Sequence, residues 1–185
     1  MTELIEIKDK TFEDELGDMP SKNHSLIMGR ITGLLFNDER FIVMPELSLD
    51  TSQIDLNQFN LKAKDELIPD VCVYLEWPEE PEDELDNDIL KMTQMPELVI
   101  EILSPKQAIN EILLKFKAYF TLGIKSCWLV IPSVQVIKIY SAKGNNIFDI
   151  QHDDTEVIDE IIGIRLPIQK IFGKITKAKS PCRLI

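Results

Sequence analysis

Hydrophobic residues recur along the chain with two different spacings, and these predict its helices and strands. From about Lys22 to Phe36 they return every three or four positions, as in an amphipathic helix. Its expected buried residues are Ile27, Ile31, Leu34 and Leu35. A second helix is expected after Ser104, which can form a capping box with Gln107, and before Gly123, which suits a helix end. Its expected apolar face consists of Ile109, Ile112, Leu113, Phe116, Tyr119 and Phe120.

Short apolar runs elsewhere predict strands, because they are rich in β-branched and aromatic residues. These runs are residues 41–49 (with a break at Pro45), 71–75, 98–103, 128–131, 136–140 and 147–150, and a short terminal helix is expected at 167–172. The strand–helix–strand unit from Leu98 to Ile131 implies a parallel pair of strands. Turns near Pro132 and Gly144 imply antiparallel hairpins. The sequence therefore predicts an α/β fold with a mixed central sheet flanked by helices.

The composition is that of a globular protein. Of the 185 residues, 44% are hydrophobic and 28% are charged, which predicts one domain over residues 1–185. No apolar run approaches the roughly 18 residues that span a membrane, and the N-terminus lacks the order of a signal peptide, so a cytoplasmic location is expected. Cys72, Cys127 and Cys182 have no metal-binding spacing, and the first two are expected to be small buried hydrophobic residues.

Charge is distributed unevenly along the chain. The formal net charge of −12 disfavours a general phosphate-binding surface. Residues 76–97 include nine acids and one base, which predicts a long exposed acidic loop at about 77–97. Residues 165–185 include six bases and no acid, which predicts a basic C-terminal tail. Such a tail could contact nucleic acid, be a solvated end, or pair with an acidic neighbour.

Two acidic residues occur where a strand does not need them. Asp70 follows Pro69 at the start of one strand, and Glu101 is surrounded by apolar residues within another. A buried ionised carboxylate is costly unless it is paired or binds a metal. Asp70 could instead cap a turn, and Glu101 could pair with a buried Lys or Arg. With Lys115 on the next helix, however, the two acids form a set suited to cleaving phosphodiester bonds.

Phosphodiester cleavage needs a metal held by oxygen atoms. Asp70, Glu101 and the carbonyl of Ile102 could together bind Mg²⁺ or Mn²⁺, which prefer oxygen ligands. Such a metal polarises the phosphoryl group and helps to generate hydroxide. Glu46, on the preceding strand, is either a further metal-site acid or an ordinary turn residue after Pro45.

Positively charged groups must also stabilise the developing negative charge or orient the attacking water. Lys115 and Lys117 lie at opposite edges of the second helix's apolar face, and helix geometry does not choose between them. His24, in the first turn of the first helix, could bind the substrate by orienting a phosphate or a water. Alternatively, it is a partly exposed residue at a helix start.

Several motifs follow one another in a characteristic order: Met19-Pro20-Ser21-x2-His24, Pro45-Glu46-Leu47-Ser48-Leu49, Pro69-Asp70, Glu101-Ile102-Leu103-Ser104-Pro105, Lys115-x3-Tyr119-x3-Gly123 and Trp128-Leu129-Val130. Over roughly residues 15–140, this order resembles the Uma-type family of endonuclease-like proteins, which is common in cyanobacteria. That family belongs to the PD-(D/E)XK, or restriction-endonuclease-like, superfamily. The resemblance implies the restriction-endonuclease-like fold and magnesium-dependent cleavage of DNA. It also implies that Asp70 and Glu101 bind the metal, and it favours Lys115 over Lys117 as the catalytic lysine, leaving Lys117 as a candidate for substrate binding.

The chain departs from the superfamily pattern at one position. Where a lysine is expected two residues after Glu101, the chain has Leu103, so the lysine would have moved onto the following helix as Lys115. This departure and the negative charge leave an alternative, a catalytically inactive nuclease-fold protein that serves as a binding or oligomerisation module. Superfamily enzymes often work in pairs, so a homodimer is also expected.

Overall fold

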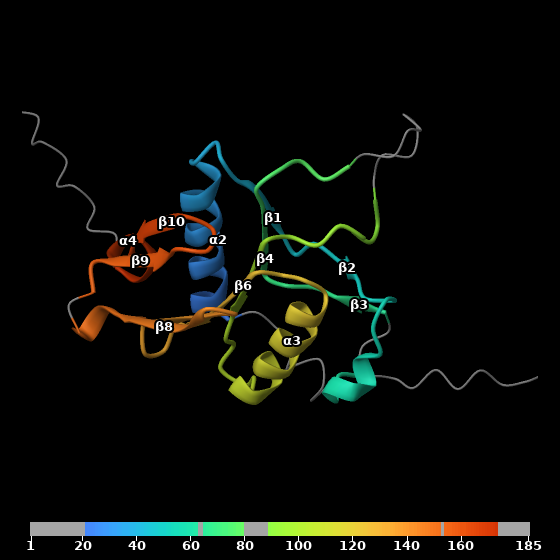
Figure 1. Cartoon of the computed structure of the whole chain (residues 1–185). Helices are drawn as coiled ribbons and strands as arrows, with labels where there is room; N and C mark the ends of the chain where they lie inside the picture. Colours follow the sequence, from blue (N-terminus) through green and yellow to red (C-terminus); the bar gives the residue numbers. More distant parts are fainter. Residues whose placement is uncertain (1–20, 63–64, 80–88, 153, 174–185) are drawn as a thin grey trace, which may run out of the picture.

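The computed structural model describes residues 21–62, 65–79, 89–152 and 154–173. Its centre is a six-stranded sheet in the order β1-β4-β5-β6-β7-β8 (Figure 1). The strands are β1 (Ile42–Pro45), β4 (Val71–Tyr74), β5 (Leu98–Ile102), β6 (Ser126–Ile131), β7 (Val136–Ser141) and β8 (Gly144–Asp149). Within this sheet β5 and β6 are parallel, and every other neighbouring pair is antiparallel. The predicted α/β fold with a mixed sheet is confirmed.

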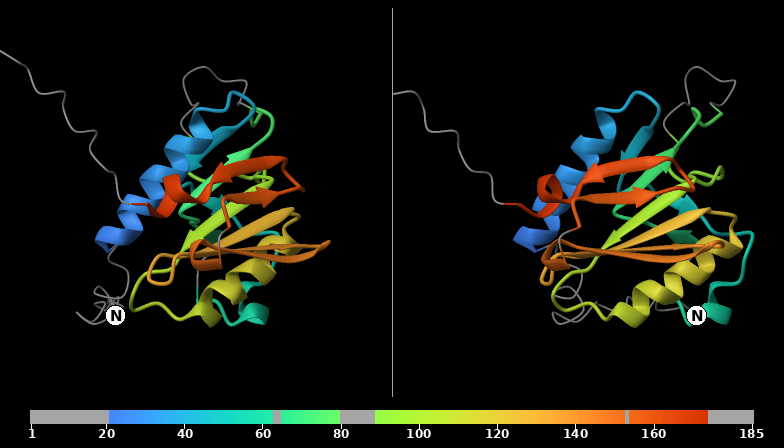
Figure 2. Two further views of the ribbon diagram at one scale, coloured as in Figure 1. Left: turned by 90° about the vertical axis from the view of Figure 1, so that its left-hand side faces the viewer. Right: turned by 60° about the vertical axis from the view of Figure 1, so that its left-hand side comes forward.

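Two helices cover opposite faces of this sheet (Figure 2). Helix α2 (Lys22–Phe36) has the predicted bounds and buries Ile27, Ile31 and Leu35 in one hydrophobic cluster. Helix α3 (Ile109–Thr121) connects β5 to β6, as predicted for the parallel pair, and buries residues in a second cluster. Each apolar stripe therefore packs on one side of the sheet.

Smaller elements extend both layers. On the α2 side, strands β9 (Glu156–Asp159) and β10 (Ile164–Pro167) form a hairpin that leads into α4 (Ile168–Phe172). On the α3 side lie β2 (Leu49–Asp50), β3 (Glu66–Leu67) and the 3-10 helix η1 (Leu56–Phe59). A second 3-10 turn, η2 (Ile150–His152), follows β8. The sequence reading predicted α4 but neither of these two small sheets.

The predicted basic tail is wrong for the part that the structure describes. Residues 165–172 belong to β10 and α4, with Ile168 and Ile171 fully buried. The apolar residues of this segment pack on α2. The free energy gained by burying them favours a folded segment, although basic residues occur between them. Arg165 lies on the solvent side, with Nη1 3.5 Å from Glu156 Oε2. Residues 174–185, where the other four bases occur, lie outside the described residues.

The predicted acidic loop at 77–97 is described only at its ends. Residues 80–88 lie outside the described residues. On the C-terminal side, Met92 is bonded to the fold: its N–H donates to the Ser48 carbonyl over 2.8 Å, and its own carbonyl accepts from the Asp50 N–H over 2.9 Å. This part of the segment therefore runs beside β2 and is not a free loop.

Helix α3 begins later than predicted. The Gln107 N–H donates to the Ser104 carbonyl over 3.1 Å, so these residues form a separate turn and not a capping box. The N-cap is Ala108, whose side chain makes no capping bond. Gly123, with φ 94°, follows the helix end as expected, because glycine adopts this conformation without strain. The expected apolar residues Ile109 and Phe120 are both exposed.

The predicted strand 41–49 is interrupted at Glu46, whose φ of 53° turns the chain between β1 and β2. The predicted turn after β7 also moves, because Gly144 is already the first residue of β8. Cys72 and Cys127 are buried free thiols, as predicted, whereas Cys182 lies outside the described residues.

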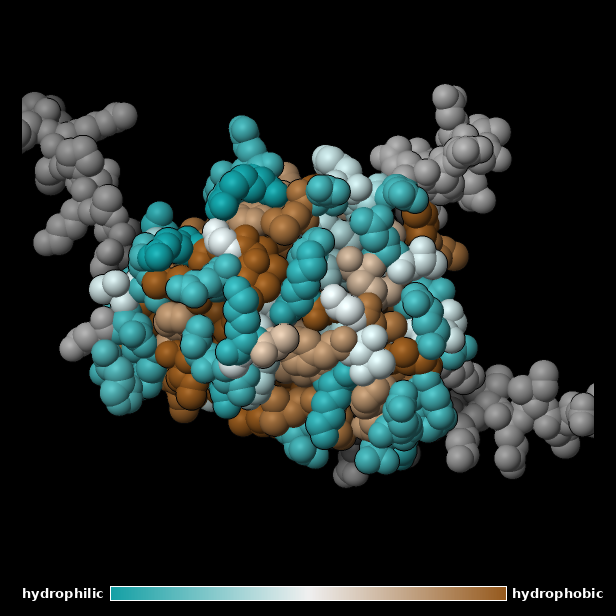
Figure 3. All heavy atoms as spheres, in the orientation of Figure 1, coloured by the Kyte–Doolittle hydropathy of each residue, from teal (hydrophilic) through white to brown (hydrophobic). Residues whose placement is uncertain are grey.

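Polar and apolar side chains are interspersed over the face shown in Figure 3. In the described part of the chain, no helix has the length and apolar character needed to cross a membrane.

Candidate active site

Asp70 and Glu101 meet because β4 and β5 are antiparallel neighbours. Val71 pairs with Ile100, and extending this register by one residue puts Asp70 opposite Glu101. The Ile102 N–H donates to Asp70 Oδ2 over 2.6 Å, which anchors the aspartate to β5. The two acids that the sequence singled out therefore stand side by side at one end of adjacent strands.

Glu101 points toward α3 and is almost completely buried, with 3% of its surface exposed. Lys115 Nζ lies 3.2 Å from Glu101 Oε1 and 3.1 Å from Oε2. The Tyr119 hydroxyl donates to Oε1 over 2.7 Å. Lys115 and Tyr119 reach the same carboxylate because residues four apart lie on one side of a helix. Burial raises the pKa of Glu101, and the charge of Lys115 opposes that rise.

His24 approaches Asp70 from the opposite layer. It lies in the first turn of α2, where its N–H donates to the N-cap Ser21 Oγ over 3.2 Å. Its Nε2 is 3.0 Å from Asp70 Oδ1. The hydrogen bond to Asp70 raises the pKa of His24, whereas burial lowers it. With 7% of its surface exposed, His24 is a buried part of the cluster and not a partly exposed helix-start residue.

Glu46 and Lys117 lie at the margin of this cluster. Glu46 is exposed, and its link to the site is a backbone bond in which its N–H donates to the Asp70 carbonyl over 3.1 Å. Lys117 is exposed on α3. Among the described residues, no group of three or more His, Cys, Asp and Glu side chains is arranged to hold a metal ion. The side chains that the structure joins in one network are therefore His24, Asp70, Glu101, Lys115 and Tyr119.

The two carboxylates suit a hard divalent cation. Mg²⁺ is commonly held by one or two protein carboxylates, with waters completing its shell, so a third acid is not required. Asp70 Oδ1 and both oxygens of Glu101 already face groups that can carry positive charge, which are His24 and Lys115. A buried carboxylate whose pKa is raised by desolvation is stabilised by a neighbouring cation. On these grounds Asp70 and Glu101 fit Mg²⁺ or Mn²⁺.

Sequence reasoning missed the contact made by Tyr119, which it treated as a core residue. Tyr119 is indeed fully buried, but its hydroxyl ends on Glu101. The spacing of four residues from Lys115 was the available signal, because it places both side chains on one edge of the helix.

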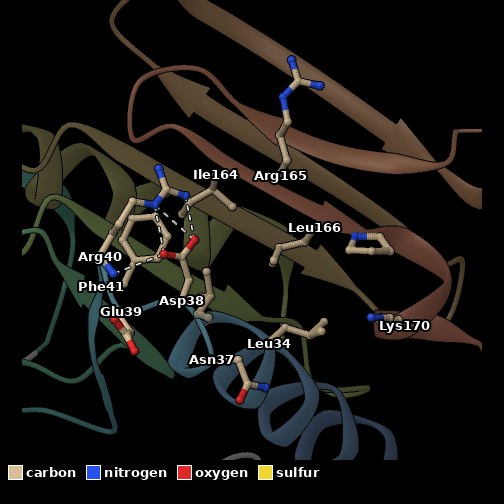
Figure 4. Close-up of a pocket in the computed structure, with 12 residues that line it drawn as sticks. Leu34, Asn37, Asp38, Glu39, Arg40, Phe41, Ile164, Arg165, Leu166 and Lys170 are labelled. Carbon is tan, nitrogen blue, oxygen red and sulfur yellow. Dashed lines mark hydrogen bonds and ion pairs between the residues drawn. The ribbon is translucent and has the colours of Figure 1, made fainter.

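A surface hollow of about 610 Å³ lies between the end of α2 and β10 (Figure 4). It is lined by residues 34–41, without Phe36, and by residues 164–167 and Lys170. Arg40, one of these residues, donates a hydrogen bond from Nη2 to Asp38 Oδ2 over 2.7 Å. None of the residues that contact the Asp70–Glu101 pair lines this hollow, so it is a separate feature of the surface.

Comparison with known proteins places the chain in a family. A family model, Uma2, described as "Putative restriction endonuclease", matches residues 10–169. The chain belongs to the Uma2 family. The matched residues include all members of the Asp70–Glu101 network.

A solved structure shares the fold of this Uma2 chain. The structure is described as a putative nuclease belonging to DUF820 from Anabaena variabilis ATCC 29413, and it is 22% identical in sequence. The match has a TM-score of 0.65 and covers 83% of this chain and 82% of that one. No curated protein matches the chain.

Proposed function

We propose that this Uma2 protein is a magnesium-dependent endonuclease of the PD-(D/E)XK type that hydrolyses phosphodiester bonds in DNA. The observation that carries the proposal is the convergence of Asp70, Glu101 and Lys115 from three different elements. The two carboxylates stand opposite each other, and the lysine ammonium lies within 3.2 Å of Glu101. Family membership and the nuclease-like fold point to the same chemistry.

In this proposal Asp70, Glu101 and the carbonyl of Ile102 hold Mg²⁺ or Mn²⁺. When bound, such a metal polarises a phosphoryl oxygen and lowers the pKa of a water. Lys115 stabilises the negative charge that develops on the phosphoryl group. Leu103 occupies the position of the usual lysine, and α3 supplies Lys115 from the neighbouring layer. Lys115 contacts both oxygens of Glu101, so its ammonium is held beside one of the two carboxylates that would bind the metal.

His24 and Lys117 are proposed to bind the substrate. His24 holds Asp70 Oδ1 and can orient a phosphate or a water beside it. Lys117 is an exposed lysine two residues beyond Lys115, suited at most to a peripheral phosphate. Glu46 would act at the edge of the site, where its charge helps to raise the pKa of His24. Pairing of two chains, as in many nucleases of this superfamily, belongs to the same proposal.

A second function is favoured by two observations. Lys115 and Glu101 form an ion pair that can be purely structural, and the net charge is −12. The chain would then be an inactive nuclease-fold protein that binds a partner or oligomerises. The two functions differ in whether DNA is cut.

The test is cleavage of supercoiled plasmid DNA by the pure chain in Mg²⁺, in Mn²⁺ and in EDTA. We expect nicking or linearisation with either metal and none in EDTA. Asp70→Ala and Lys115→Ala should each lose activity by roughly 100-fold or more, since each removes a group that acts on the reacting phosphate.

Lys143→Ala is the matched control, because it removes the same side chain from the exposed turn between β7 and β8, outside the Asp70–Glu101 network. It should retain activity within a few-fold. Equal cleavage by the wild type, Asp70→Ala and Lys115→Ala would sink the nuclease proposal. A wild type that cuts no DNA under these conditions would favour the inactive alternative.

A further inference from the structure

The oxygens of the two metal-site carboxylates are not equivalent. Glu101 Oε1 accepts hydrogen bonds from the Tyr119 hydroxyl over 2.7 Å and from Lys115 over 3.2 Å. Among the described residues, Oε2 accepts from Lys115 alone. Asp70 shows the same division. Its Oδ2 receives the backbone N–H of Ile102, and its Oδ1 faces His24. Each carboxylate thus has one oxygen fixed by a neutral donor and another facing a group that can carry charge.

Tyr119 is itself held firmly. Its side chain is fully buried, and the centroid of its ring lies 6.4 Å from that of Phe116. The Phe116 ring in turn packs against Tyr140, with 5.4 Å between the two ring centroids. Its carbonyl accepts the Ile124 N–H over 3.1 Å just beyond the helix end. A hydroxyl anchored in this way fixes the carboxylate that it contacts, in the manner of the groups that orient metal ligands from behind.

A neutral donor suits this position. A second ammonium on Oε1 would repel a divalent cation, whereas a hydroxyl satisfies the oxygen without adding charge. Tyr119 also fills the space behind Glu101 with an apolar ring, which helps to keep water from competing for the carboxylate.

We propose that Tyr119 is a positioning residue for the metal site, whose hydroxyl fixes Glu101 Oε1 and thereby presents Oε2 as the metal ligand. This inference rests on the proposed function, because it assumes that Glu101 binds the metal. Tyr119 touches neither metal nor substrate, and its effect passes through Glu101.

The first experiment measures Mn²⁺ binding to the full chain by isothermal titration calorimetry. Tyr119→Phe removes only the hydroxyl, and we expect its affinity to fall by roughly 10- to 100-fold, the usual effect of losing a group that orients a ligand. Tyr74→Phe is the matched control. Tyr74 is equally buried in the same cluster, but its hydroxyl donates to the Gln94 carbonyl, away from Asp70 and Glu101. The affinity of this control should be unchanged.

A second measurement needs no change at Tyr119. The chain contains three tyrosines, so incorporation of 3-fluorotyrosine gives three ¹⁹F resonances, assigned with Tyr74→Phe and Tyr140→Phe. Titration with Mg²⁺ should shift the Tyr119 resonance in step with saturation and leave that of Tyr74 in place. This readout remains if Tyr119→Phe fails to fold.

The outcomes separate the inference from the proposed function. If the wild type binds neither Mn²⁺ nor Mg²⁺ at millimolar concentration, the metal site itself is refuted. If the wild type binds metal and Tyr119→Phe binds equally well, or the Tyr119 resonance does not respond, the metal site stands and the role of Tyr119 is refuted. Equal weakening in Tyr74→Phe would show a general loss of packing and would also overturn the role.

Discussion

Among the described residues two carboxylates are buried, Glu101 on β5 of the central sheet and Asp159 on β9 of the β9–β10 hairpin, and their surroundings differ. Asp159, with 1% of its surface exposed, accepts from Ser126 Oγ over 2.6 Å and from Trp128 Nε1 over 2.7 Å. Its other oxygen accepts the Ile161 N–H over 3.0 Å. All of these donors are neutral, and no Lys or Arg pairs with Asp159 among the described residues. The arrangement ties β9 to β6.

Glu101 instead shares its surroundings with a lysine and a second acid. Lys115 is 24% exposed at its side chain, so it can exchange its partner for a phosphate or water, unlike the fixed donors around Asp159. Burial of a carboxylate alone therefore does not mark a functional site. A nearby second acid and an exchangeable cation do, because together they leave an oxygen available to a metal.

The largest expected effect is a loss of DNA cleavage when Glu101, but not Asp159, is replaced. Glu101→Gln should reduce DNA cleavage by roughly 100- to 1,000-fold, because a lost metal ligand forfeits several kcal/mol of transition-state stabilisation. Its stability should not fall. Gln keeps an acceptor for Tyr119, and it removes a charge whose burial is costly. Plasmid cleavage and thermal melting of one preparation test both points.

A Glu101→Gln protein that melts well below the wild type would assign Glu101 the structural role of Asp159. A protein that cuts DNA at the wild-type rate would remove it from the metal site.

The next effect is on stability. Asp159→Ala should cost about 3 kcal/mol of unfolding free energy, because it leaves the Ser126 hydroxyl and the Trp128 N–H buried without an acceptor. Denaturant unfolding measures the loss. Glu160→Ala, one residue further along and exposed, is the control and should change little. Residual folded Asp159→Ala protein should bind Mn²⁺ as the wild type does. A selective loss of metal affinity would show that Asp159 also supports the metal site and is not purely structural.

Part of this picture could be predicted from the sequence. The spacing of Ile27, Ile31 and Leu35 predicted α2 with its observed bounds. Asp70 and Glu101 could be chosen as candidates because an acid in an apolar strand is costly. Their meeting depends on the register of β4 and β5, which is set by packing across the sheet and is not written in either strand alone.

The remaining misses have the same origin in long-range contacts. Asp159 lies in a segment of mixed polarity, and its partners Ser126 and Trp128 are more than 30 residues away in the chain. The β9–β10 hairpin was missed for this reason, and its Arg165 was assigned to the basic tail. Local rules also misplaced the start of α3, because the Ser104 carbonyl closes a backbone turn with Gln107 before the helix begins.

The smallest expected effect is the dependence of stability on pH. Burial raises the pKa of Glu101 in the folded chain above its unfolded value. Between these two values the folded state holds a proton that the unfolded state has released, so folding is favoured as pH falls through this window and disfavoured as pH rises. Gln cannot titrate. The melting temperature of Glu101→Gln minus that of the wild type should therefore increase as pH rises through the window.

His24 acts in the same direction, because its folded-state pKa is also raised. Its stabilising contribution is complete below its unfolded pKa and is lost as pH rises through the folded value. The advantage of the wild type over His24→Gln should thus shrink with rising pH. Melts in EDTA across the acid and neutral range measure both differences. A Glu101→Gln difference that stays constant or shrinks would mean that Lys115 and Tyr119 fully offset the burial of Glu101. The site would then carry no excess cost for a metal to relieve, and Glu101 would resemble Asp159 after all.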